Sequence, residues 1–161
     1  MAQVRGLSVF ADAVASGHLS PIEFDQLWIE AGSMSSSGSH SQLELPRRGN
    51  LFFGADFDDY DSKQVELILT LTLTMGGQRW DGKKLTWHGD NKMERINLPT
   101  RAKGGVAYKN TAILFTRHGG EFEMTVVPWN SDTAESWRRT SRETGRLYRA
   151  GTYSDRLCGM L

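Results

Sequence analysis

The N-terminal part of the chain carries apolar residues at the spacing of short α-helices. In the first segment these are Val9, Phe10, Ala13 and Val14. Gly17 ends that segment, and a second one starts at Pro21 with Ser20 as its cap, so the pattern predicts two short helices. We expect residues 1–32 to form a helical N-terminal extension. A Ser/Gly-rich linker at 33–42 follows, because this stretch has too few apolar residues to pack.

From residue 43 onward the spacing changes from helical to alternating. Residues 65–75 alternate most clearly, with Val or Leu at every second position, which predicts a long strand with one buried face. Glycines mark further turns, and we expect one hairpin around Asp81 and another across Gly119. The sequence thus predicts a mainly β fold with helical extensions, in which residues 43–161 form an antiparallel β-barrel (an open pseudobarrel) or a sandwich.

One further helix is expected near the C-terminal end of this β domain. The stretch at about 132–144 follows Ser131, a good N-cap, and precedes Gly145, a typical C-terminal stop. Arg138 and Arg142 are four residues apart and share one face of this helix. We expect both to act as auxiliary phosphate contacts.

Charge is distributed unevenly along the chain, although the 19 basic and 19 acidic residues cancel. Residues 1–77 hold four Lys or Arg against ten Asp or Glu, whereas residues 78–118 hold nine against three. Residues 119–161 are balanced, with six of each. The middle of the chain is therefore strongly basic, which favours a polyanionic partner such as nucleic acid.

The basic segment also contains side chains that recognise bases. Arg forms paired hydrogen bonds with guanine, Asn and Gln do so with adenine, and aromatic rings stack on exposed bases. The candidate nucleic-acid-binding residues are Gln78, Arg79, Trp80, Lys83, Lys84, Trp87, His88, Asn91, Lys92 and Arg95, together with Arg138 and Arg142. Strand residues alternate between core and solvent, so Trp80 and Trp87 are either ligand contacts or core residues. Our leading interpretation is a module that binds duplex DNA without catalysis.

Two other functions fit parts of the same sequence. Trp80, Trp87 and Trp129 would form an aromatic platform in a β-sandwich that binds carbohydrate or assembles head to tail as a homo-oligomer, as in a phage structural protein. Asp61, Asp81 and Lys83 would be the most workable set for a Mg²⁺-dependent endonuclease. The histidines show no metal-ligand spacing, and we expect no catalytic residue, metal or cofactor.

The cysteine content and the hydropathy bear on location. Cys158 is the single cysteine, which excludes an internal disulfide framework. No apolar run approaches the roughly 20 residues that a membrane-spanning helix needs. We expect a cytoplasmic protein without a membrane partner.

Four stretches carry a resemblance to a known family. They are GSHSQLELP at 38–46, NLFFG at 50–54, KMERINLPT at 92–100 and YKNTAILFTRHGGEFEMTV at 108–126. Residues from about 39 to 128 resemble the pseudobarrel DNA-binding domain of plant transcription factors, which also occurs beside phospholipase-D-like catalytic domains in some restriction endonucleases. In that family two arms at one end of the barrel enter the major groove. The resemblance implies a DNA-reading module, related to restriction or phage defence, whose catalytic subunit would be separate.

Overall fold

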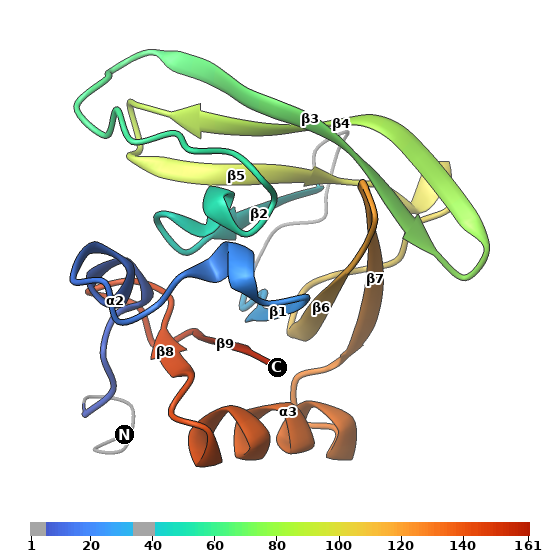
Figure 1. The fold of residues 1–161 in the computed structure, drawn as a ribbon. Coiled ribbons are helices and arrows are strands. Elements are labelled where there is room, and N and C mark those ends of the chain that lie inside the picture. The colour runs from blue at the N-terminus through green and yellow to red at the C-terminus, as the bar shows by residue number, and fades with distance from the viewer. Residues whose placement is uncertain (1–5, 34–40) are drawn as a thin grey trace.

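The computed structural model describes residues 6–33 and 41–161, which form a curled β-sheet with two short helices (Figure 1). The strands are β1 (Gln26–Glu30), β2 (Ser41–Leu45), β3 (Val65–Met75), β4 (Gln78–His88), β5 (Met93–Leu98), β6 (Thr111–His118), β7 (Glu121–Pro128), β8 (Leu147–Arg149) and β9 (Leu157–Met160). The helices are α2 (Phe10–Ala15) and α3 (Asp132–Glu143), with 3₁₀ turns η1 (Pro21–Glu23), η2 (Gly49–Leu51) and η3 (Arg101–Lys103).

The strands pair in the order β2-β5-β4-β3-β7-β6-β1-β9-β8. Neighbouring strands are antiparallel except β3 and β7, which run parallel, so the sheet is mixed. The sheet curls around one large apolar cluster as an open half-barrel (Figure 1). This arrangement confirms the predicted mainly β fold with helical extensions. No helix in the described residues is long and apolar enough to cross a membrane.

The first predicted helix is confirmed as α2, but the second is wrong. From Pro21 the chain makes only the single turn η1 and then enters strand β1. Leu27, Trp28 and Ile29 are fully buried, because β1 lies between β6 and β9 and both of its faces are covered. When a run of apolar residues is buried on both sides, its hydrophobic pattern has no periodicity that distinguishes a strand from a helix. Residues 26–30 of the predicted helical extension therefore form a strand of the sheet.

Strand β2 forms one edge of the sheet. The predicted linker at 33–42 overlaps this strand, because Ser41 and Gln42 belong to β2. Residues 34–40 of the linker lie outside the described residues. Arg156 connects the edge to β1, because its Nη1 donates to the carbonyl oxygens of Glu30 at 2.9 Å and Glu44 at 3.2 Å. A side chain, and not a ladder of backbone hydrogen bonds, thus bridges the gap in the half-barrel.

The hairpin that joins β3 to β4 turns at Gly76 and Gly77. Both have positive φ, 58° and 83°, as a two-residue turn with the twist of the strands requires. The predicted turn around Asp81 is wrong, because Asp81 lies inside β4. The following Gly82, with φ 66°, accommodates an irregularity in the pairing of β3 with β4. The predicted hairpin across Gly119 is confirmed by the pairing of β6 with β7.

The apolar side of β3 is buried along only part of the strand. Leu71 and Leu73 lie in the core, whereas Val65 and Leu67 are 63% and 58% exposed. The pairing with β4 shifts at Ile68, where β3 has one extra residue. Because side chains alternate between faces, one extra residue moves the preceding side chains to the opposite face. Val65 and Leu67 therefore lie on the outer surface of the sheet.

The predicted C-terminal helix is confirmed as α3, which covers part of that outer surface (Figure 1). Ser131 caps it, since its Oγ accepts from the N–H of Ala134 at 3.2 Å. Trp137 packs with Trp28 in a second apolar cluster, and Trp28 Nε1 donates to Ser141 Oγ at 2.8 Å. This cluster draws on β1, β6, β8 and β9. The outer face of β2, β5 and β4 is left without such cover.

Candidate nucleic-acid interface

The outer face of β2, β5 and β4 carries polar side chains from all three strands. Gln42 lies opposite Asn97, and Thr86 lies opposite Arg95, while Ile96 between Arg95 and Asn97 points into the core. We call this surface the outer β2–β5–β4 face. Its members are Gln42, Glu44, Lys84, Thr86, His88, Met93, Arg95 and Asn97.

Gln42 links the two neighbouring polar side chains of β5. Its Nε2 donates to Asn97 Oδ1 at 3.0 Å, and its Oε1 accepts from Arg95 Nη1 at 3.3 Å. Glu44 lies opposite Arg95 in register, but its carboxylate pairs with Arg156 at 3.6 Å. Among the described residues no carboxylate forms an ion pair with Arg95. The amide groups of Gln42 and Asn97 and the guanidinium of Arg95, whose charge no described carboxylate neutralises in an ion pair, therefore lie side by side on a half-buried surface.

His88 adds a neutral hydrogen-bonding group to the same face. Its Nε2 lies 2.9 Å from Thr86 Oγ1. Burial and, next, the charge of Arg95 lower the pKa of His88, and the carboxylate of Asp90 opposes them. His88 is therefore uncharged at pH 7 and serves there as a donor or acceptor, not as a cation.

The turn at 89–92 continues this face at the end of the sheet. Asn91 and Lys92 are both exposed, and Lys92 has a positive φ of 56°. Gly89 packs so tightly that a Cβ there would lie 2.3 Å from the carbonyl oxygen of Ser62. The turn is thus fixed against the segment that precedes β3, and it presents one amide and one ammonium group beside His88.

At the end of β4 that follows the β3–β4 turn, the polar groups of two predicted residues, Gln78 and Trp80, form hydrogen bonds within the protein. Trp80 is half-buried, and its Nε1 donates to the carbonyl oxygen of Lys103 at 2.8 Å. Gln78 Nε2 donates to the carbonyl oxygen of Gly104 at 3.3 Å. Both side chains hold the loop around η3 against the sheet, which gives them a structural role.

The charged predicted residues at that end are also separated from the outer β2–β5–β4 face. Arg79 forms ion pairs with Asp81 and Glu121, so its charge is compensated. Lys83 lies opposite the buried Leu71 and not beside Lys84 on the outer face. Burial and the charge of Lys103 lower the pKa of Lys83.

The prediction that Trp87 contacts nucleic acid is wrong, because its side chain is fully buried. Its Nε1 donates to the carbonyl oxygen of Ser62 at 2.9 Å. The alternative interpretation, that Trp87 is a core residue, is confirmed. Trp80 is half-buried and Trp129 is 50% exposed, so the three tryptophans do not form one exposed platform.

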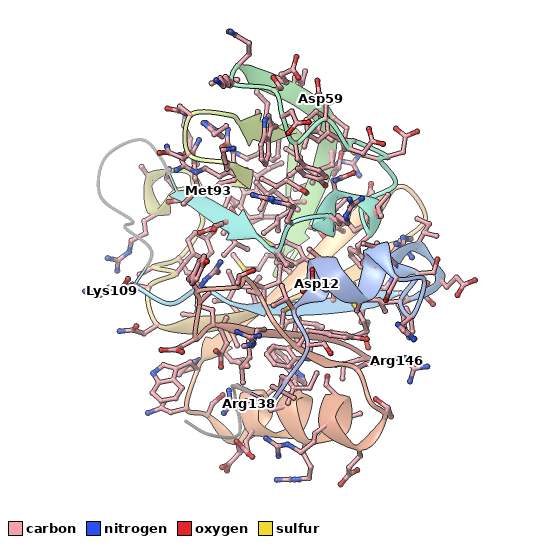
Figure 2. The ribbon with its side chains drawn as sticks, turned by 90° about the vertical axis from the view of Figure 1, so that its left-hand side faces the viewer. Asp12, Asp59, Met93, Lys109, Arg138 and Arg146 are labelled. Carbon is pink, nitrogen blue, oxygen red and sulfur yellow. The ribbon has the colours of Figure 1, made fainter. Side chains whose placement is uncertain are left out.

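The two predicted arginines of α3, Arg138 and Arg142, lie far from this surface. Figure 2 shows Met93 toward one end of the molecule and Arg138 at the other. Arg138 pairs with Glu30 at 3.3 Å and with Glu135 at 3.1 Å, so it anchors the helix to β1. Arg142 is exposed on the same helix. The predicted set is thus divided, with Lys84, His88, Asn91, Lys92 and Arg95 brought together.

The residues proposed for an endonuclease are not brought together. Asp81 Oδ1 accepts from Thr72 Oγ1 at 2.9 Å, whereas Asp61 precedes the start of β3 at Val65. The strand between Val65 and Thr72 spans roughly 20 Å at about 3.3 Å per residue. Within residues 6–33 and 41–161 no group of three or more His, Cys, Asp or Glu side chains is placed to hold a metal ion.

Sequence reasoning did not include five members of the outer β2–β5–β4 face in the predicted site. These are Gln42, Glu44, Thr86, Met93 and Asn97. The available signal was the two-residue period of β5, which places Asn97 on the same face as Arg95. The comparisons with known proteins add no candidate residue. No model of a protein family matches this chain, and a search of curated proteins finds no match.

Proposed function

We propose that this protein binds duplex DNA through the outer β2–β5–β4 face and the adjoining turn at 89–92. The observation that carries the proposal is the fixed row of Arg95, Gln42 and Asn97, whose guanidinium and amide groups are the side chains best suited to base edges. Lys84 and Lys92 lie beside this row and would neutralise phosphates. The resemblance to the pseudobarrel DNA-binding domain leads to the same proposal.

In this proposal the protein reads DNA and a separate subunit supplies any cleavage. A role in restriction or phage defence follows from the resemblance alone. We also infer a cytoplasmic location, with which the single, buried and unpaired Cys158 agrees.

A gel-shift series against duplex DNA, single-stranded DNA and RNA, at several salt concentrations, tests the proposal. We expect a duplex shift that weakens steeply with salt. Exchange of Lys84 and Lys92 for Glu should weaken binding at least about tenfold and leave the melting temperature nearly unchanged. The matched control exchanges Arg139 and Arg142, both exposed on α3, for Glu. Equal loss in both double variants, or no shift with any nucleic acid, would contradict the proposal.

One observation favours a second candidate, a protein-interaction or self-assembly role. Val65 and Leu67 are 63% and 58% exposed, and they lie opposite His88 and Thr86 on the outer surface. Such exposed apolar side chains on the outer surface of a sheet suit contact with another protein. Salt-sensitive self-association, without retention of DNA, would favour this candidate.

A further inference from the structure

A buried carboxylate organises the loop beside the proposed DNA interface. Glu94 on β5 is 1% exposed. It accepts hydrogen bonds from the N–H of Arg48 at 2.7 Å, the N–H of Asn50 at 2.9 Å and the hydroxyl of Tyr60 at 2.7 Å. Burial raises the pKa of Glu94, and these hydrogen bonds act against the rise. They also tie the segment at 46–62 to β5.

The same segment is bent so that Arg47 points toward the β4–β5 turn. Arg48 has a positive φ of 72°, which is uncommon for a residue with a side chain, and its N–H is the group that Glu94 binds. Asn50 closes the loop, since its Oδ1 accepts from the N–H of Phe57 at 3.0 Å and its Nδ2 donates to the Phe57 carbonyl at 3.2 Å. The backbone at Arg47 is therefore fixed by buried contacts on its C-terminal side.

Arg47 itself lies on an aromatic support. The centre of its guanidinium is 5.3 Å from the centroid of the Tyr60 ring and 5.7 Å from that of Trp87, a cation–π arrangement. Its Nη2 donates to the carbonyl oxygen of Lys92 at 3.2 Å. The residue is exposed, and among the described residues no carboxylate forms an ion pair with it. Its charge and most of its five N–H donors thus remain available.

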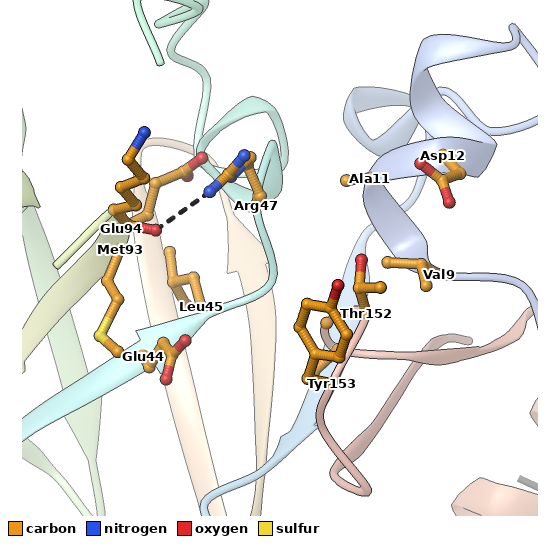
Figure 3. Close-up of a pocket in the computed structure, with 13 residues that line it drawn as sticks. Val9, Ala11, Asp12, Glu44, Leu45, Arg47, Met93, Glu94, Thr152 and Tyr153 are labelled. Atoms are coloured by element: carbon orange, nitrogen blue, oxygen red, sulfur yellow. Dashed lines mark hydrogen bonds between the residues drawn. The ribbon is translucent and has the colours of Figure 1, made fainter. Parts of the chain in front are cut away.

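Arg47 stands at the rim of a cleft of about 350 Å³ between β2, β5 and α2, where Figure 3 draws its hydrogen bond to the turn. Lys92 lines the same cleft, and the carboxylates of Asp12, Glu44 and the buried Glu94 line its other walls. These carboxylates would repel an anion. The favourable position for an anion is therefore the end of the cleft where Arg47 and the exposed Lys92 lie.

We propose that Arg47 contacts a backbone phosphate of DNA beside the turn at 89–92, and that Glu94 and Tyr60 are positioning residues for it. This inference rests on the proposed function. A planar guanidinium offers parallel N–H donors that match two phosphate oxygens. The cation–π contacts with Tyr60 and Trp87, together with the hydrogen bond to the Lys92 carbonyl, restrict its position before DNA binds. The contact extends the interface from the outer β2–β5–β4 face to the loop at 46–62.

Exchange of Arg47 for Gln tests the contact in the full chain. We expect binding to a duplex to weaken roughly 3- to 10-fold, equally for all duplex sequences, and the slope of log affinity against log salt to fall by about 0.9, the value for one phosphate contact. Arg139→Gln, on the exposed side of α3, is the matched control and should change neither quantity. Equal behaviour of the two variants, with wild-type binding intact, would overturn the inference and leave the proposed function standing. No binding by the wild type would overturn both.

Exchange of Tyr60 for Phe tests the positioning. This change keeps the ring under Arg47 and removes the hydroxyl that binds Glu94. We expect Tyr60→Phe to weaken binding about 2- to 5-fold in the wild-type background and to have no effect in the Arg47→Gln background, because coupled residues are not additive. The same loss in both backgrounds would mean that Tyr60 acts only through overall folding, and it would overturn the positioning role. The unfolding midpoint of each variant, measured in parallel, confirms that the folded protein is being compared.

Discussion

Arg95 and Gln42 are joined across two neighbouring strands, with Arg95 Nη1 3.3 Å from Gln42 Oε1. Gln42 in turn donates to Asn97 at 3.0 Å. Three side chains that suit base edges are thus oriented before any ligand arrives. Preorganisation of this kind reduces the loss of side-chain conformational entropy that accompanies binding.

The first prediction concerns Arg95. Exchange for Lys keeps the charge but removes the planar, two-pronged donor, so affinity for a preferred duplex should fall by about 1–3 kcal/mol while nonspecific binding is retained. Competition between duplexes that differ at single base pairs measures this change. If Arg95 instead contacts only phosphate, Arg95→Lys will discriminate among duplexes as well as the wild type does.

The second prediction uses two adjacent lysines on opposite faces of β4. Lys84 lies on the outer β2–β5–β4 face, and Lys83 lies opposite buried Leu71 near Lys103. Lys84→Glu should therefore weaken DNA binding about tenfold, while Lys83→Glu should leave it nearly unchanged. Fluorescence anisotropy at fixed salt measures both. If Lys83→Glu weakened DNA binding more than Lys84→Glu, the interface would lie on the inner side of the sheet.

The third prediction is a pH dependence due to His88. Burial and the charge of Arg95 lower the pKa of His88 below the ordinary 6.5. The folded state therefore binds fewer protons at His88 than the unfolded state does. The protein loses stability as the pH falls from the unfolded pKa toward the lower folded pKa. Bound phosphate would oppose the charge of Arg95 and raise the pKa of His88. Affinity should therefore increase as pH falls from about 7.5 to 5.5. His88→Gln should remove the increase, and an unchanged pH profile in that variant would exclude His88 as its source.

The fourth prediction separates stability from binding. Ser141→Ala leaves the buried indole N–H of Trp28 without its acceptor, which should lower the free energy of unfolding by about 1–3 kcal/mol. Denaturant unfolding measures this effect. Ser136→Ala, on the same helix but partly exposed, is the control and should cost less. DNA affinity of the folded Ser141→Ala variant should match the wild type.

Local patterns in the sequence identified most elements, and tertiary contacts explain where they failed. The alternation at 65–75 predicted β3, and the caps of α3 predicted its start and end. Strand β1 was not predicted because α3, distant in sequence, covers one face of it and the main core covers the other. The hydrophobic periodicity of a short segment does not indicate that both of its sides are buried.

The candidate site shows the same division. The charge asymmetry led to Lys84, Lys92 and Arg95, because net charge along a segment needs no knowledge of the fold. It also led to Arg79, and helical spacing led to Arg138. Each of these arginines has an acidic partner on a distant element, Glu121 for Arg79 and Glu30 for Arg138. Trp87 was ambiguous because burial on one face of a strand depends on what packs there. Ion pairing and burial of this kind become visible only when the strands are assembled.

The arginine that bridges the gap in the half-barrel has a consequence for solubility. An edge strand such as β2 offers unpaired backbone groups to any other extended chain, and this is a common route to aggregation. Arg156 occupies the Glu44 carbonyl oxygen, one of the acceptors that an added strand would need, and places a positive charge beside it. The same guanidinium that joins β2 to β1 therefore also opposes the pairing of β2, the strand that carries Gln42, with a second molecule.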